Sequence, residues 1–81
     1  MVRNFNYLYI RSSYKLPDCD TVVEGLETIE NGDCPRVKAE ADALALELAR
    51  DLAQEKNATW ATIKLFHSDY PYDAKATYIR Q

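Results

Sequence analysis

The side chains that could catalyse a reaction or hold a metal ion are few in this sequence. His67 is the single histidine, with Ser68 directly after it, and Cys19 and Cys34 are the two cysteines. The cysteine spacing matches neither a zinc site nor a thioredoxin-type motif. A serine that adjoins a histidine in sequence cannot reach the geometry that activates a nucleophile. We therefore expect a protein that is not an enzyme and that uses no metal ion or cofactor.

The two cysteines leave two alternatives open. In the cytosol we expect both to be free thiols, because disulfides persist mainly in oxidising compartments. A Cys19–Cys34 disulfide would instead close a loop of about 15 residues, which in the chain-entropy model stabilises a fold by about 3 kcal/mol. The sequence alone is compatible with both.

Residues suited to binding are more numerous, and charge separates them into two sets. Residues 16–57 contain eleven acidic and four basic side chains, a net charge of −7, whereas the rest of the chain contains two acidic and six basic ones, a net charge of +4. In the basic segments aromatic rings alternate with cations, a combination found in single-stranded nucleic-acid sites and at protein interfaces. The basic and aromatic set consists of Tyr7, Tyr9, Arg11, Trp60, Lys64, Tyr78 and Arg80, and the acidic set consists of Glu40, Glu47 and Asp51.

A long amphipathic helix over residues 35–57 is the element around which the other segments are arranged. Its apolar residues recur at steps of three and four, and good helix formers fill its interior. We expect Asp33 or Cys34 at the N-cap, Pro35 in the first turn and Asn57 at the C-terminal end. The predicted buried stripe is Val37, Ala41, Leu44, Ala45, Leu48 and Leu52. The opposite side carries Ala39, Ala43, Leu46 and Ala53, with Ala49 at its margin.

Three further segments alternate in the manner of strands, namely residues 4–14, 59–67 and 74–80. Residues 20–31 are ambiguous. As a helix this segment is capped by Asp20 and ends at Asn31-Gly32, and as a strand it has that pair in a hairpin turn. We expect a helix here and keep the strand as the alternative.

These elements predict one α+β domain over residues 1–81, with the order β-α-α-β-β. A three-stranded, mostly antiparallel sheet carries one long and one short helix on one face. The residues expected to face the helices are Leu8, Ile10, Ala61, Ile63, Leu65, Thr77 and Ile79. The basic and aromatic set is then expected on the outer sheet face, together with Phe5, Thr62, Phe66 and Ala76.

This pattern predicts a small non-enzymatic interaction protein that regulates or inhibits another protein by stoichiometric binding. The aromatic sheet face suits a protein partner or a second copy in a homodimer, and the acidic set suits a partner with a basic or nucleic-acid-binding site. The alternative is a single-stranded nucleic-acid-binding module that uses the aromatic and basic face, although a pI near 5.0 argues against it.

Size and acidic charge also resemble those of phage-encoded inhibitors of host defence enzymes, including anti-CRISPR proteins. That resemblance implies inhibition of a host complex by protein binding. No segment approaches the ~20 apolar residues of a membrane span, and the N-terminal residues lack a signal-peptide core. We expect a cytoplasmic protein, in the host cytoplasm if a virus encodes it, with no membrane partner.

Overall fold

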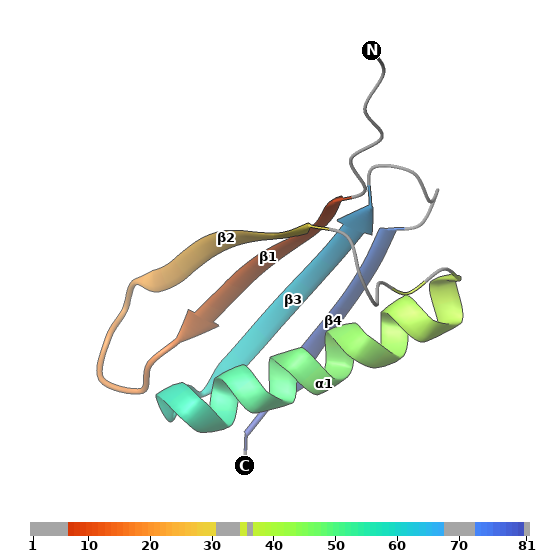
Figure 1. Ribbon diagram of the computed structural model, residues 1–81. Coiled ribbons are helices and arrows are strands. Elements are labelled where there is room, and N and C mark those ends of the chain that lie inside the picture. Colours follow the sequence, from red (N-terminus) through yellow and green to blue (C-terminus); the bar gives the residue numbers. More distant parts are fainter. Residues whose placement is uncertain (1–6, 31–34, 36, 68–72, 81) are drawn as a thin grey trace.

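The computed structural model describes residues 7–30, 35, 37–67 and 73–80, with the backbone alone at Tyr7, Ile29 and Glu30. Along the chain it forms β1 (Tyr7–Lys15), β2 (Val22–Glu30), α1 (Lys38–Lys56), β3 (Trp60–His67) and β4 (Asp73–Ile79). The strands form one antiparallel sheet in the order β2-β1-β3-β4, and α1 lies on one face of it (Figure 1). The expected α+β class is confirmed. The expectation of three strands and two helices is wrong.

The difference lies in residues 20–31, where β2 replaces the expected short helix. A tight turn after β1, closed by a bond from the Cys19 N–H to the Leu16 carbonyl (3.2 Å), brings β2 back along β1. The hairpin then pairs every residue of β1 with one of β2, from Tyr7 opposite Glu30 to Lys15 opposite Val22. Helix propensity is a weak prior. The β-branched residues and Gly25 lower it further here, so strand pairing decides the structure.

The long helix begins later than expected and ends where expected. Val37 is its N-cap in an extended conformation, without a side-chain capping bond, and it is exposed rather than part of the core. The expected caps Asp33 and Cys34 lie outside the described residues. At the other end Asn57 adopts the left-handed conformation (φ 53°, ψ 39°), and N–H groups of the cap donate to the carbonyls of Ala53 and Gln54. Asparagine tolerates this conformation better than most residues do.

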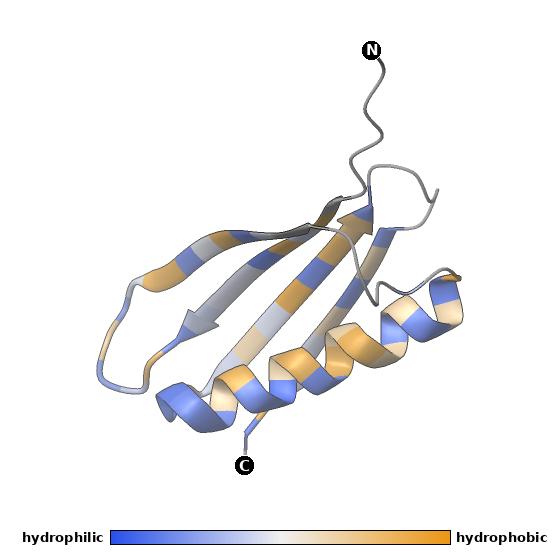
Figure 2. Cartoon of the chain, viewed as in Figure 1, coloured by the Kyte–Doolittle hydropathy of each residue, from blue (hydrophilic) through white to orange (hydrophobic). Residues whose placement is uncertain are grey.

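Small side chains line the contact between helix and sheet. Four alanines spaced by four residues form the innermost ridge of α1, and all are fully buried: Ala41, Ala45, Ala49 and Ala53. Buried and half-buried residues alternate along β3, and its buried Ile63 and Leu65, together with Ala74 of β4, contribute to the core that α1 covers. Figure 2 shows strongly hydrophobic segments in this strand. The expected stripe is therefore correct at Ala41 and Ala45, which are buried, and at Leu44, Leu48 and Leu52, which are partly buried against the core. Placing Ala53 on the back of the helix and Ala49 at the margin of that side is wrong, because both alanines are fully buried against the sheet.

The two faces of β4 are the reverse of the expected ones. Ala74 is buried, and Ala76 and Tyr78 pack against the core, while Thr77 and Ile79 lie on the outer face. The register fixes this arrangement, since Thr77 pairs with Thr62 on the side of the sheet away from α1. A shift of one residue moves every side chain of a strand to the other face.

Candidate functional site

The sheet face opposite α1, called the open face below, gathers most of the predicted basic and aromatic residues. No helix covers it in the part of the chain that the structure describes (Figure 1). Residues paired across neighbouring strands point to the same side, so the registers arrange the open face in four rows. From β2 to β4 the rows are Thr28-Tyr9-Phe66-Asp73, Leu26-Arg11-Lys64-Lys75, Glu24-Ser13-Thr62-Thr77 and Val22-Lys15-Trp60-Ile79.

The second of these rows places three cations side by side on adjacent strands. Arg11 lies opposite Lys64, and Lys64 lies opposite Lys75. Like charges directly opposite each other destabilise a sheet. Within the described residues none of the three forms an ion pair with a carboxylate. These three residues, called the cation row below, therefore concentrate positive charge on the open face.

Two rings and two hydroxyls flank the cation row. On one side Tyr9 and Phe66 stack on each other across β1 and β3, with centroids 5.1 Å apart and planes 15° apart. On the other side the hydroxyls of Thr62 and Thr77 share a hydrogen bond of 2.8 Å. Trp60 lies in the last row and is half-buried. The open face thus combines a stacked ring pair, a hydrogen-bonded hydroxyl pair and three adjacent cations, groups that can contact a binding partner.

The structure brings together only part of the predicted basic and aromatic set. Tyr9, Arg11, Trp60 and Lys64 share the open face, but Tyr78 packs against the core beneath the helix. Arg80 is directed away as well, because its Nη1 donates to Oδ1 of Asn57 (3.0 Å) and its backbone N–H donates to the carbonyl of Thr59 (2.9 Å). Placing Tyr78 and Arg80 on the outer sheet face is therefore wrong. Tyr7 lies in β1, and its side chain is outside the described part of the structure.

Sequence reasoning missed Lys75, the third member of the cation row. The sequence pattern gives Lys75 no role, because it predicts the two faces of β4 the wrong way round. Pairing the short β-branched residues Thr62 and Thr77 across β3 and β4 would have placed Lys75 beside Lys64, since threonine pairs are favourable cross-strand neighbours.

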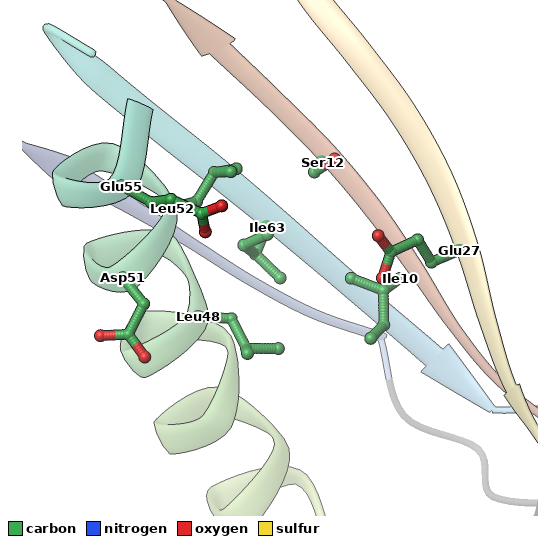
Figure 3. A pocket seen from close by; sticks show the side chains of 8 residues that line it. All are labelled: Ile10, Ser12, Glu27, Leu48, Asp51, Leu52, Glu55 and Ile63. Carbon is green, nitrogen blue, oxygen red and sulfur yellow. The ribbon is translucent and has the colours of Figure 1, made fainter. Parts of the chain in front are cut away.

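The predicted acidic residues Glu40, Glu47 and Asp51 are all exposed on α1. Asp51, with Glu55 of α1 and Glu27 of β2, borders a groove between the helix and the β1–β2 hairpin (Figure 3). Oδ1 of Asp51 is 3.8 Å from Nε of Arg50, and both side chains are more than half exposed. Such an exposed pair contributes little to stability.

The described residues contain no cluster of three histidine, cysteine or carboxylate side chains that could hold a metal ion. Cys19 is a free, half-buried thiol in the turn between β1 and β2, and Cys34 lies outside the described residues. His67 is buried at the end of β3 on the side that faces the helix. Within the described part of the chain no helix has the length and apolar character of a membrane span.

Comparisons of the chain with protein-family models, with curated proteins and with solved structures give no match.

Proposed function

We propose that this chain is a non-enzymatic binding protein, a small regulator or inhibitor that acts by stoichiometric contact and binds an acidic segment of another protein on its open face. The cation row carries this proposal. The three cations are adjacent, none of them forms an ion pair with a described carboxylate, and they repel one another. Carboxylates of a partner would relieve that repulsion while forming charge-assisted hydrogen bonds.

The dimensions of the cation row suit an acidic peptide segment. Strands lie about 4.8 Å apart, so the three cations span roughly 10 Å across the sheet. Leu26 continues the row on β2 and is 59% exposed, so an apolar residue of the partner has a contact at the end of the row. Tyr and Arg side chains are enriched among residues that dominate protein–protein binding energy. The open face carries both in Tyr9 and Arg11.

Two observations favour a protein segment over nucleic acid. Tyr9 and Phe66 turn one face of each ring toward the other ring, which leaves less π-surface for bases to stack on. The described side chains of the open face carry four cations (Arg11, Lys15, Lys64, Lys75) against two acids (Glu24, Asp73), and the whole chain carries a net charge of −3. A long polyanion would extend beyond the open face and be repelled by the net negative charge of the rest of the chain. A short acidic segment would contact the cations alone.

Single-stranded nucleic acid remains the second candidate, because Trp60 lies on the same face as the cations and beside Lys15. A second copy of the chain is one possible protein partner, since α1 carries five acidic and three basic side chains. Light scattering at low and high salt measures that self-association directly.

A titration with two labelled probes tests the proposal. The probes are a glutamate-rich peptide with interspersed leucines and a thymidine oligonucleotide, each followed by anisotropy and by Trp60 fluorescence. The test variant is Arg11→Gln/Lys64→Gln/Lys75→Gln. The control variant is Lys38→Gln/Arg50→Gln/Lys56→Gln, which removes the same charge from α1.

We expect the peptide to bind the native chain more tightly than the oligonucleotide does. The test variant should weaken peptide binding about tenfold or more, since three charge contacts of up to about 1 kcal/mol each are lost, and the control variant should leave it nearly unchanged. Tighter binding of the oligonucleotide, with quenching of Trp60 that weakens steeply in salt, would favour the second candidate. Absence of binding by both probes at low salt would rule out the open face as a binding surface for anions.

A further inference from the structure

The helix layer covers only half of the sheet. An α-helix is about 10 Å wide and strands lie about 4.8 Å apart, so one helix covers about two strands. Here α1 packs on β3 and β4, reaches β1 only slightly, and leaves β2 uncovered. In Figure 1 the β1–β2 hairpin extends beyond the edge of the area that α1 covers. Within the described residues, no second helix lies beside α1 over this half of the sheet.

A groove follows this uncovered half, with an apolar floor. Its floor is formed by Ile10 and Ile63 of the sheet and by Leu48 and Leu52 of α1 (Figure 3). Leu48 and Leu52 are only partly buried, although they are the larger apolar residues beside the alanine ridge of α1. The hollow encloses about 210 Å³, less than the ~300 Å³ at which pockets for small molecules begin. The groove thus suits an extended apolar surface rather than a compact ligand.

The apolar surface continues from the groove onto β2. Val23 lies opposite Tyr14 on the same face and is 37% exposed. Between it and Glu27, Gly25 lies opposite Ser12 and adds no side chain to this wall. A Cβ at Gly25 would come within 3.1 Å of the Ser12 hydroxyl, so the glycine avoids a close contact and leaves no side chain protruding here.

Both walls of the groove carry negative charge. Glu27 projects from β2, and Asp51 and Glu55 line the opposite wall on α1 (Figure 3). In the described part of the chain neither Glu27 nor Glu55 forms an ion pair. Two acidic walls about an apolar floor favour an occupant with an apolar centre and basic flanks.

We propose that this groove binds a basic amphipathic helix of a partner protein. Apolar residues at a spacing of three and four would lie on the floor, and lysine or arginine side chains on both flanks would meet Glu27 on one side and Asp51 and Glu55 on the other. A bound helix would occupy the uncovered half of the sheet and complete the helix layer. The net negative charge of α1 makes a second copy of this chain a poor occupant. The site is separate from the open face and does not depend on the function proposed for that face.

The probe for the test is a labelled peptide of about 18 residues with leucines at i, i+3, i+4 and i+7 and lysines on both flanks. Its control is the same composition in scrambled order. The groove variant is Glu27→Gln/Asp51→Asn/Glu55→Gln. The matched control variant is Glu24→Gln/Glu40→Gln/Glu47→Gln, which removes the same charge from residues that do not line the groove. Circular dichroism establishes that both variants are folded.

We expect the amphipathic peptide to bind the native chain and the matched control with similar affinity, and the groove variant about tenfold more weakly. In a methyl NMR spectrum the peptide should shift Ile10, Leu48, Leu52 and Ile63, and leave Val22 and Ile79 of the open face unchanged. The proposal would be overturned if the scrambled peptide bound equally well, or if both variants lost the same amount of peptide affinity. It would also be overturned if the peptide shifted Val22 and Ile79 instead of the groove residues. A dimer that the groove variant dissociates would overturn it as well, because the occupant would then be a second copy.

Discussion

Arg11 on β1 lies directly opposite Lys64 on β3, on the sheet face that α1 does not cover. A cross-strand pair of like charge costs stability, and Lys75 on β4 extends the repulsion to a third strand. A sheet selected for stability alone would place an acid or a neutral residue at the central position. The cation row is thus a local conflict between charge and fold, of the kind found at functional sites.

Reversing the central charge should stabilise the protein. In Lys64→Glu the new carboxylate lies between Arg11 and Lys75 and replaces two repulsive pairs by two attractive ones. We expect the free energy of unfolding to rise by about 0.5–2 kcal/mol, measured by urea denaturation at low salt, while binding of the acidic peptide is lost. Lys64→Gln, which only removes the repulsion, should give a smaller gain. Equal or lower stability of Lys64→Glu would show that the cations do not interact across the strands.

The stacked rings beside the cation row should be energetically coupled. A double-mutant cycle with Tyr9→Leu and Phe66→Leu isolates the ring pair from the other contacts of each residue. We expect a coupling energy of about 0.5–1.5 kcal/mol, measured by thermal or urea unfolding of the four proteins. The pair Tyr9 and Thr77, which occupies different rows of the same face, serves as the control and should give additive effects. Additivity in both cycles would contradict a stabilising stack.

Strong periodicity made part of the fold predictable. In β3 the aliphatic residues Ala61, Ile63 and Leu65 alternate with polar or aromatic ones, and the structure buries every second residue as the pattern indicates. The long helix was predictable for the same reason, and Asn57 marked its end correctly. Where a segment of 8 to 19 residues repeats one clear period, local chemistry and tertiary packing favour the same structure.

Elsewhere the local pattern was indecisive and distant pairing decided the structure. Residues 22–30 carry apolar residues that would gather on one helical face and show no clean alternation, yet their pairing with β1 makes them a strand. In β4, Ala76 and Tyr78 could face the core as well as Thr77 and Ile79, so only the register with β3 separates the two faces. That register also placed Lys75 in the cation row and removed Tyr78 from the open face. The candidate site was therefore predictable on β1 and β3 but not on β4.

Enlarging the alanine ridge should destabilise the protein strongly. Ala45 is fully buried where α1 meets the sheet, so Ala45→Leu forces the helix away from β3 and β4. We expect a loss of about 1–3 kcal/mol in the free energy of unfolding, measured by urea denaturation. Ala43→Leu, the same change two residues earlier on an exposed position of α1, is the matched control and should change stability by less than about 0.5 kcal/mol. If both variants were equally stable, the helix would not be in close contact with the sheet.

The stability of the C-terminal end of α1 should depend on the backbone conformation of residue 57 more than on the hydrogen bond between Arg80 and Asn57. Asn57→Ala forces an alanine into the left-handed conformation (φ 53°), which costs an L-residue with a Cβ about 1–2 kcal/mol. Asn57→Gly relieves that strain but removes Oδ1, the acceptor for Nη1 of Arg80 (3.0 Å). Since that bond is exposed, Asn57→Gly and Arg80→Ala should each change the free energy of unfolding by less than about 0.5 kcal/mol. Both variants should therefore be more stable than Asn57→Ala in thermal unfolding. A loss in Arg80→Ala as large as in Asn57→Ala would instead make the contact between Arg80 and the helix end the dominant stabilising interaction there.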